Sequence, residues 1–268
     1  MNKLEGVQAL WKCFYSAALY RKVGVAWKGA AVGYLALVIG IFCVVYGVGM
    51  QIGFNKFVDV ESPEVVAQIP EIVIENGLAR TPEKRPYVIF AEMDGKRKEF
   101  AIIDTTQKTI PPNLGGVMVF LAETQFGMKK NSRRETRVYD LSEVKSFAID
   151  QGKVKGWLGL GKSFLVLLTV PFMFAGLLAF RLIQALLFSL AGMILGKIKK
   201  VSLPYPVLFR LSVVAMTPGM LLGLITEQLK LHIPWSAWIF ILLGIGYLAF
   251  AMRRVDDSEG EDPAAIAR

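Results

Sequence analysis

The sequence predicts an α-helical integral membrane protein with four transmembrane helices and an inserted β-rich (α+β) extracytoplasmic domain. Hydrophobic residues make up 54% of the 268 positions, which is more than a soluble domain usually contains. Charged residues are concentrated between Asn55 and Lys162, and long stretches outside that block carry almost none. This separation is typical of apolar membrane spans that flank a water-soluble insert.

The net charge is +9, and the positions of the charged residues along the chain argue against nucleic acid as a partner. The predicted insert, residues 55–162, is nearly neutral, with 17 Lys and Arg against 15 Asp and Glu. The positive excess lies beside the apolar runs, where lipid headgroups and insertion topology account for it. We therefore expect no nucleic-acid partner.

The residue inventory disfavours metal and disulfide chemistry. Cys13 falls in the basic N-terminal segment and Cys43 in the first apolar run, so we do not expect them to pair. The insert has no cysteine and His232 is the single histidine, so neither a CxxC motif nor a histidine cluster is available for zinc or haem. We expect no metal and no cofactor.

Residues 1–23 predict an amphipathic interfacial helix. Apolar side chains recur at helical spacing along one face, at Leu4, Val7, Leu10, Trp11, Phe14, Tyr15 and Ala18. The residues expected at the membrane surface are Trp11, Phe14, Tyr15, Arg21 and Lys22. A helix packed on the protein's own cytoplasmic surface is an equally good interpretation.

The first transmembrane helix is predicted within residues 24–54. Gly29–Phe54 has no charged residue over 26 positions, which is enough to cross about 30 Å of hydrocarbon. A cleaved signal peptide is the alternative interpretation. The apolar run exceeds the usual length of about 7–15 residues and no clear A-x-A site follows it, so a retained span is preferred.

Residues 163–252 predict three further transmembrane helices. Ser163–Gly196 is 34 residues long and is interrupted only by Arg181, so it is too long for a single upright span. One span that tilts or bends is preferred, and two short segments forming a re-entrant pair are the alternative. Pro206–Thr226 and Ile233–Met252 are the third and fourth spans.

Basic residues beside the spans predict the orientation. They precede the first span, separate the second from the third at residues 197–200, and follow the fourth at residues 253–254. With four spans these groups share one side, which the positive-inside rule makes cytoplasmic. We expect a bacterial plasma (inner) membrane protein with cytoplasmic termini and residues 55–162 outside. Residues 253–268 are predicted to form a disordered acidic cytoplasmic tail.

Alternating apolar residues and turn signals predict that the insert is mainly β, with one or two helices. The predicted strands are residues 71–75, 87–90, 100–103, 117–121 and 137–141. Asn76-Gly77 and Asp94-Gly95 are typical of hairpin turns. Ser62 is predicted to cap a short helix, and Gly156–Gly161 to form a flexible hinge before the second span.

No nucleotide-binding loop and no hydrolase elbow occurs in the sequence, which indicates a non-enzymatic protein. Asp104 is the one carboxylate of the insert that stands out, because it follows three apolar strand residues and precedes Thr105-Thr106. Such a residue caps a turn or binds a ligand. Turn capping is preferred.

The membrane half offers better candidates for a ligand or partner site. Arg181 is the sole charge in its apolar run, and Gln184 lies close to one helical turn on, so the two are expected to share a face. Alternatively, Arg181 extends to the cytoplasmic interface. We expect Arg210 to help set the orientation of the third span in the membrane rather than to bind a ligand. Thr217-Pro218 is expected to break the third span, where it either lines a substrate path or only kinks the helix.

The four predicted spans contain no acidic residue, because the third span is taken to end at Thr226 and Glu227 is assigned to the following loop. Proton- and sodium-coupled carriers usually rely on carboxylates within the membrane. This absence disfavours a coupled carrier.

Several short motifs occur in a characteristic order along the chain. They are Phe14-Tyr15-Ser16, Tyr20-Arg21, Ile69-Pro70, Ile102-Ile103-Asp104-Thr105-Thr106, and Arg210 with Ala215, Thr217 and Pro218. In this order the chain resembles, from about residue 10 to residue 250, a bacterial membrane family known as domain of unknown function 1189. The resemblance implies a membrane region similar to that of Yip-type multi-pass proteins.

The leading hypothesis from the sequence is a non-enzymatic membrane protein that scaffolds or senses envelope components through its extracytoplasmic domain. The alternative is lipid or solute handling by the transmembrane bundle. The expected partners are membrane lipids, an envelope protein or a second copy of the chain.

Overall fold

The computed structural model describes residues 3–93, 95–111, 115–129, 136–231 and 233–256. It divides into two compact units, a helical unit of Met1–Val48 with Leu168–Arg268 and an inserted unit of Gly49–Leu167. The fold combines helices and β-sheets. Among the described residues, four helices are long and apolar enough to cross a membrane, judged by length and composition.

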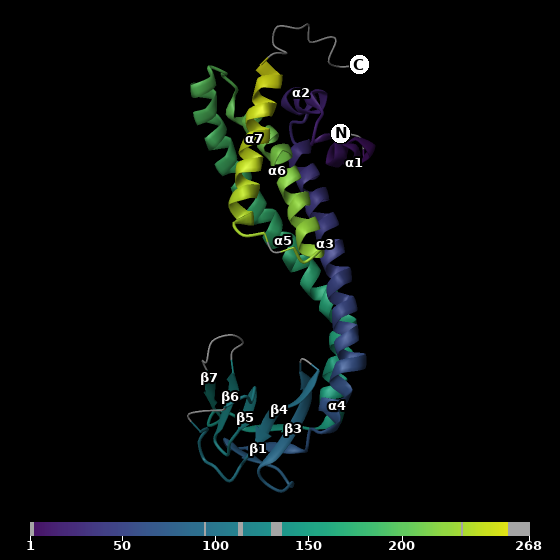
Figure 1. The fold of residues 1–268 in the computed structure, drawn as a ribbon, viewed down its shortest axis with the longest axis vertical. Coiled ribbons are helices and arrows are strands. Elements are labelled where there is room, and N and C mark those ends of the chain that lie inside the picture. The colour runs from purple at the N-terminus through teal and green to yellow at the C-terminus, as the bar shows by residue number, and fades with distance from the viewer. Residues whose placement is uncertain (1–2, 94, 112–114, 130–135, 232, 257–268) are drawn as a thin grey trace. The chain divides into compact units, whose positions relative to one another are not determined.

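The helices are labelled in Figure 1: α1 (Lys3–Lys12), α2 (Ala17–Ala26), α3 (Ala30–Lys56), α4 (Ser62–Ala67), α5 (Gln151–Lys199), α6 (Tyr205–Gln228) and α7 (Ser236–Asp256). A π-helical turn over Phe57–Glu61 joins α3 to α4. The four apolar helices are α3, α5, α6 and α7, which correspond in order to the four predicted spans. Of the predicted acidic tail, residues 253–256 continue α7, and the rest lies outside the described residues.

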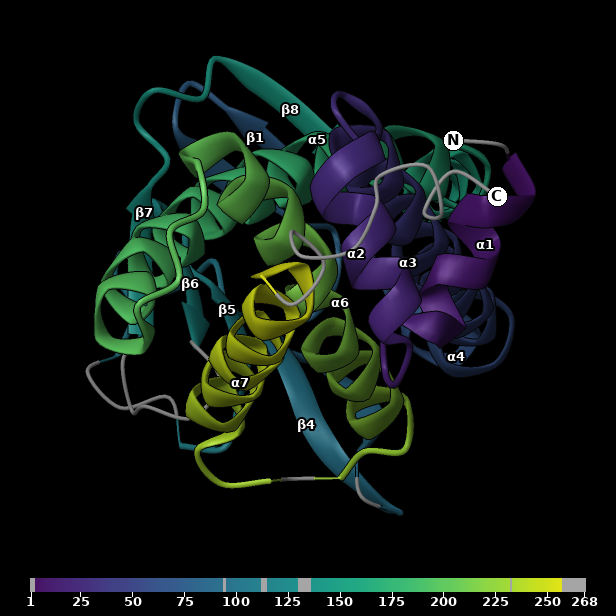
Figure 2. The same cartoon turned by 90° about the horizontal axis from the view of Figure 1, so that it is seen from above.

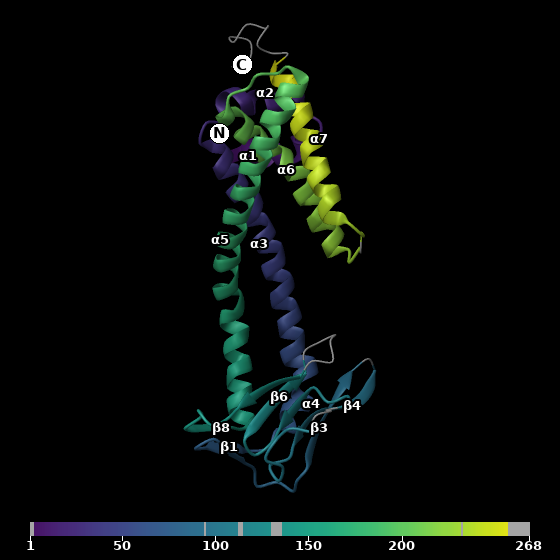
Figure 3. The same cartoon turned by 90° about the vertical axis from the view of Figure 1, so that its left-hand side faces the viewer.

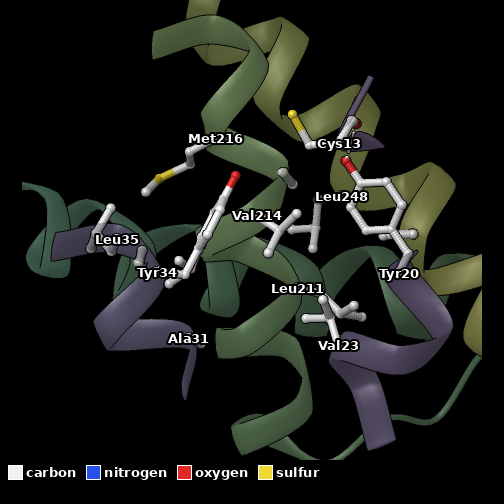
Figure 4. Packing of buried hydrophobic residues seen from close by; sticks show 14 of the residues in the cluster. Cys13, Tyr20, Val23, Ala31, Tyr34, Leu35, Leu211, Val214, Met216 and Leu248 are labelled. Atoms are coloured by element: carbon white, nitrogen blue, oxygen red, sulfur yellow. Dashed lines mark hydrogen bonds between the residues drawn. The ribbon is translucent and has the colours of Figure 1, made fainter. Parts of the chain in front are cut away.

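The single helix predicted over residues 1–23 is wrong, because the structure has two helices there. Ser16 adopts an extended backbone, with φ −87° and ψ 105°, and its hydroxyl accepts a hydrogen bond from the Leu19 backbone N–H at 3.2 Å. This is an N-cap, and it starts α2 anew. The Tyr20 hydroxyl donates to the Cys13 carbonyl at 2.7 Å and so ties α2 to the end of α1 (Figure 4).

The predicted helix cap at Ser62 is also wrong. The Ser62 hydroxyl donates to the Val58 carbonyl at 3.0 Å, four residues earlier. Glu61 holds the N-cap position of α4, with a helical backbone and no side-chain cap hydrogen bond. The chain passes from α3 through the π-helical turn into α4 with helical geometry throughout. Ser62 therefore supports a continuing helix and does not start a new one.

The predicted hinge at Gly156–Gly161 is wrong, because α5 runs through it as one unbroken helix (Figure 3). A side chain at position 161 would lie 2.8 Å from the Phe54 ring, so close packing between α3 and α5 accounts for this glycine. The stretch 163–196 also lies within one helix, and no re-entrant pair forms. At its end Lys200 has φ +58° and the Val201 N–H bonds the Gly196 carbonyl at 3.0 Å, which is a Schellman-type stop.

The core of the helical unit is built from residues far apart in the sequence. α6 packs against α7 and against α2, as the view in Figure 2 shows for α6 and α7. Tyr34 and Leu35 of α3, together with Leu211 of α6 and Leu248 of α7, are fully buried in this core (Figure 4). In contrast, no residue of α5 from Ser163 to Phe180 is buried.

The described residues of the inserted unit form eight strands: β1 (Ile72–Glu75), β2 (Leu78–Arg80), β3 (Tyr87–Met93), β4 (Lys96–Ile103), β5 (Val119–Leu121), β6 (Gln125–Lys129), β7 (Thr136–Asp140) and β8 (Ser146–Ile149). One sheet has the order β2-β1-β8 and the other β3-β4-β5-β6-β7. β4 and β5 pair in parallel, and the other pairs are antiparallel. Every predicted strand has a counterpart, whereas β2, β6 and β8 were not predicted.

The tight turn between β1 and β2 explains why Asn76 and Gly77 stand at this place in the sequence. Glu75 pairs with Leu78, so Asn76 and Gly77 form a two-residue loop. Their φ angles of +51° and +80° are those of a type I′ hairpin. A Cβ at position 77 would also lie 2.8 Å from the Cα of Ser142, so both the backbone conformation and the space require glycine.

Candidate functional site

A cavity of about 910 Å³ lies in the helical unit among α3, α5, α6, α7 and the connection from α6 to α7. This volume is within the range of small-molecule sites, about 300–1,000 Å³. Its wall is mainly aromatic, aliphatic and methionine side chains, including Phe42, Met173, Leu177, Phe180, Phe188, Met216, Met220, Leu224, Phe240 and Ile241. The cavity therefore suits a largely apolar ligand.

Arg181 and Gln184 both line this cavity, as their spacing suggested. The Arg181 guanidinium donates from Nη1 to the Gln184 Oε1 at 2.5 Å, and it lies over the Phe180 ring at 5.7 Å from the centroid. Among the described residues it has no carboxylate within salt-bridge distance. A guanidinium has five N–H donors, so most of them remain available to a ligand.

Three further polar residues of the cavity wall, Tyr46, Glu227 and Lys230, were not identified from the sequence. The Tyr46 hydroxyl donates a hydrogen bond to the Glu227 carboxylate. Glu227 belongs to the last turn of α6, so its assignment to the loop after a third span ending at Thr226 is wrong. The sequence alone could have marked Glu227 as a candidate, because it is the only acidic residue from position 163 to position 255.

Thr217 and Pro218 do not line the cavity, although the neighbouring Met216 and Gly219 do. Both are buried in α6, which continues through Pro218. The Thr217 hydroxyl donates to the Val213 carbonyl at 3.3 Å. The proline frees the carbonyl of Val214 instead, since that is the acceptor four residues before it. The expected break in this helix is absent.

Arg210 lines a second hollow, of about 600 Å³, together with Lys28, Leu186, Tyr205, Pro206 and Phe209. Its Nε donates to the Pro206 carbonyl at 3.0 Å. The Nη1 atom is buried and has no hydrogen-bond partner within the described part of the chain. Arg210 is thus separate from the Arg181 cavity.

Asp104 lies in the inserted unit, where it caps the turn after β4. The side chain is 5% exposed. Its Oδ1 accepts from the Thr106 backbone N–H at 3.1 Å and from the Thr106 hydroxyl at 2.5 Å, and its Oδ2 accepts from the Gln107 amide at 2.8 Å. Both carboxylate oxygens thus accept hydrogen bonds from the turn itself, as expected for a capping role.

The residues predicted at the membrane surface divide into two groups. Trp11 and Tyr15 are strongly exposed, at 72% and 61%, and Lys22 is also exposed. Phe14 packs against the helical core, and its carbonyl accepts from the Tyr247 hydroxyl at 3.3 Å. The Arg21 Nε donates to the Arg254 carbonyl at 3.1 Å. Phe14, in the turn between α1 and α2, and Arg21 of α2 thus attach this segment to α7.

The main cavity has a small set of polar side chains on a largely apolar wall. Its polar groups are one guanidinium, one ammonium, one carboxylate held by a tyrosine, the Gln184 amide, and the hydroxyls of Thr226 and Ser236. Among the described residues no group of three or more His, Cys, Asp and Glu side chains is placed to hold a metal ion. An amphipathic molecule with an anionic group matches this set of side chains.

Comparison with known proteins gives a family and no closer relative. Residues 7–252 match the family model described as a protein of unknown function, DUF1189. No curated protein and no solved structure matches the chain. The matched range includes α3, α5 and α6, α7 as far as Met252, and all eight strands described in the insert. The chain therefore belongs to the DUF1189 family.

Proposed function

We propose that this chain is a multi-pass protein of a bacterial plasma membrane, crossed by α3, α5, α6 and α7. Large apolar side chains remain exposed along these helices, among them Val44 and Val48 of α3, Phe172 of α5 and Leu242 of α7. Exposed apolar faces of this extent are unfavourable in water and favourable in hydrocarbon. We also propose, from the resemblance noted in the sequence, that this membrane region is similar to that of Yip-type multi-pass proteins.

The basic flanks support an orientation with the insert outside. Lys28 precedes α3, Lys197 and Lys199 lie in the last turn of α5 with Lys200 directly after it, and Arg253 and Arg254 lie in the last turn of α7. In a four-span arrangement these groups share the cytoplasmic side. The α6–α7 connection, with the cavity beside it, then lies toward the extracytoplasmic side.

The function that the geometry supports best is the binding of an amphipathic, lipid-like molecule in the main cavity. The observation that carries this proposal is Arg181, a guanidinium on an apolar cavity wall with an amide but no carboxylate beside it. A charge in a low-dielectric region is costly unless an opposite charge accompanies it. A phosphate or carboxylate headgroup supplies that charge and pairs with the guanidinium in bidentate geometry. The aromatic and methionine wall receives the acyl chain.

Photo-cross-linking from the cavity tests this function. A photoreactive phenylalanine analogue replaces Met220 on the cavity wall, and a second protein carries it at the exposed Leu242 of α7. After irradiation in native membranes, mass spectrometry identifies the adducts. We expect anionic amphiphiles to be enriched at position 220 relative to position 242, which samples bulk lipid.

The matched variants are Arg181→Gln, which removes the cavity charge, and Arg253→Gln, an exposed arginine outside the cavity. We expect the enrichment at position 220 to fall about tenfold or more in the first variant, because a charge-assisted contact is lost. The second variant keeps the enrichment. Identical adducts at positions 220 and 242, or an enrichment that survives Arg181→Gln, would contradict the proposal.

A second candidate function, recognition of an envelope protein, is favoured by the edge strand β7. Among the described strands β7 pairs with β6 alone, so its other side is an open edge. Val138 and Tyr139 on this strand are about half exposed, at 51% and 46%. An open edge with exposed apolar side chains suits strand addition by an extended partner segment.

The edge of β7 is tested by placing the photoreactive residue at Val138 and, as a control, at the exposed Glu92 of β3, the opposite edge of the same sheet. We expect a discrete protein adduct from position 138, and its loss when Tyr139→Asp is added, because an unpaired charge disfavours the docked strand. Equal adducts from both edges, or none from β7, would exclude this function.

A further inference from the structure

We propose that Lys28, Tyr205 and Arg210 bind the phosphate of an anionic phospholipid headgroup at the N-terminal end of α6. The inference rests on the proposed membrane placement of the four apolar helices, but it concerns a different site from the Arg181 cavity. The two sites share no lining residue.

The geometry begins with the side chain of Arg210. Its Nε donates to the Pro206 carbonyl at 3.0 Å, one helical turn earlier, and this bond fixes the direction of the guanidinium. The Nη1 atom is buried yet has no hydrogen-bond partner among the described residues. Arg210 as a residue also lines the hollow, so its positive charge acts on an anion held there.

The charges around the hollow are all of one sign. Lys28 and Arg210 both line it, and among the described residues neither has a carboxylate within salt-bridge distance. The only acidic residue from position 163 to position 255 is Glu227, at the far end of α6. It is separated from Arg210 by about 25 Å along the helix axis. Two cations without an internal counter-charge attract an anion.

The rest of the hollow identifies the anion as part of a lipid. Leu186 and Phe209 form an apolar wall beside the two cations, and the exposed Tyr205 adds a phenol hydroxyl. A free phosphate gains nothing from the apolar wall, whereas a phospholipid covers it with the start of an acyl chain. Basic pockets between membrane helices on the cytoplasmic side are typical sites for anionic headgroups.

The test measures lipid retention by the full-length protein. The purified protein in detergent micelles is titrated with dioleoyl phosphatidylglycerol or with phosphatidylcholine of the same chains, and bound lipid is counted by native mass spectrometry. We expect phosphatidylglycerol to bind about tenfold or more tightly than phosphatidylcholine, because its phosphate lacks a covalently attached cation.

The decisive variant is Lys28→Gln with Arg210→Gln, compared with Lys197→Gln with Arg253→Gln. The control pair removes one lysine and one arginine that are exposed and do not line the hollow. We expect the first pair to lose one tightly bound phosphatidylglycerol per chain and the control pair to retain it. Retention by both pairs would overturn the proposal.

Two further arms separate the alternatives. Lys28→Arg with Arg210→Lys keeps both charges, so it retains the lipid if charge is the cause, and loss of lipid in this folded variant would overturn the proposal. Displacement of phosphatidylglycerol by millimolar inorganic phosphate would assign the hollow to a free anion and reject the lipid. Arg181→Gln is expected to leave phosphatidylglycerol binding at this hollow unchanged, so failure of the cavity proposal is distinguished from failure of this one. Release of the protein from membranes by alkaline carbonate would show that it does not span the membrane and would reject both proposals.

Discussion

The carboxylate of Asp104 accepts three hydrogen bonds within the turn that follows β4, although the residue is almost fully buried. Asp104→Ala leaves the donors of Thr106 and Gln107 without these acceptors. We expect it to lower the free energy of unfolding by about 1–3 kcal/mol. Chemical denaturation of the full-length protein, with hydrogen exchange of residues 101–107, measures the loss.

The control for this prediction is Asp140→Ala. Asp140 also caps a turn, with its Oδ1 accepting from the Ser142 N–H at 2.7 Å, but it lies on the surface. Hydrogen bonds from the Ser142 side chain and backbone lower the pKa of Asp140 below its ordinary value. We expect a smaller loss of stability than for Asp104. Equal losses would show that burial of Asp104 contributes nothing.

At the residue scale, the sequence predicted what depends on local spacing. Arg181 and Gln184 are three positions apart on a helix, so their hydrogen bond follows from helical geometry. Asp104 likewise bonds only to residues two and three positions on. The bond between Tyr46 and Glu227 joins residues 181 positions apart and depends on helix packing, so no local pattern indicated it.

At the element scale, the end of α5 depends on a glycine. A Cβ at position 196 would lie 2.6 Å from the carbonyl oxygen of Val201, a backbone atom that cannot rotate away. We expect Gly196→Ala to destabilise the protein by about 1–3 kcal/mol, despite the better helix propensity of alanine. Thermal unfolding in detergent measures the shift.

Gly176 in the same helix is the matched control, because a Cβ there meets no atom within 4 Å. Gly176→Ala is expected to be neutral or to stabilise the protein by about 0.5–1 kcal/mol. Gly192→Ala is intermediate, since its neighbours at 3.3 Å are the flexible ends of Leu208 and Leu248. A fall in stability as large at position 176 as at position 196 would contradict this order.

The positions of the elements could be predicted from the sequence more readily than their ends. Charge-free runs located the four apolar helices, because length and composition suffice for that. The glycines of 156–161 were misread as a hinge, since nothing in the sequence indicates that Phe54 packs on Gly161. Pro218 was misread as a break, although the buried surroundings of α6 maintain the helix through it.

At the scale of the whole molecule, the proposed topology predicts which residues are accessible from outside the cell. We expect Lys96→Cys, exposed on β4, to react with a membrane-impermeant maleimide in intact cells. Lys197→Cys, near the end of α5, is expected to react only after the membrane is opened. The reverse result would invert the orientation, and labelling of both in intact cells would exclude four spans.

The native thiols give this experiment a low background. Cys13 and Cys43 are both buried. Burial raises the pKa of the Cys13 thiol to about 12, so the reactive thiolate is nearly absent at neutral pH. The protein without introduced cysteines is therefore expected to remain unlabelled, and strong labelling of it would contradict the packing of Cys13.

The arrangement of the whole molecule was the least accessible to prediction. The sequence indicated an α+β insert but not the parallel pairing of β4 with β5, which brings together strands separated by a long connection. The two cavities likewise combine residues from distant segments, such as Lys28 with Arg210. Such combinations depend on tertiary contacts that periodicity and composition do not contain.

The hairpin at Asn76-Gly77 has a consequence for the chemical ageing of the protein. Asn-Gly pairs are prone to deamidation, in which the backbone nitrogen of the glycine attacks the asparagine side-chain amide. Here the Gly77 nitrogen donates to the Val144 carbonyl at 3.0 Å, and close contact with Ser142 restricts the movement of this glycine. The folded insert therefore protects Asn76 from deamidation, and isoaspartate at position 76 would record molecules that have spent time unfolded.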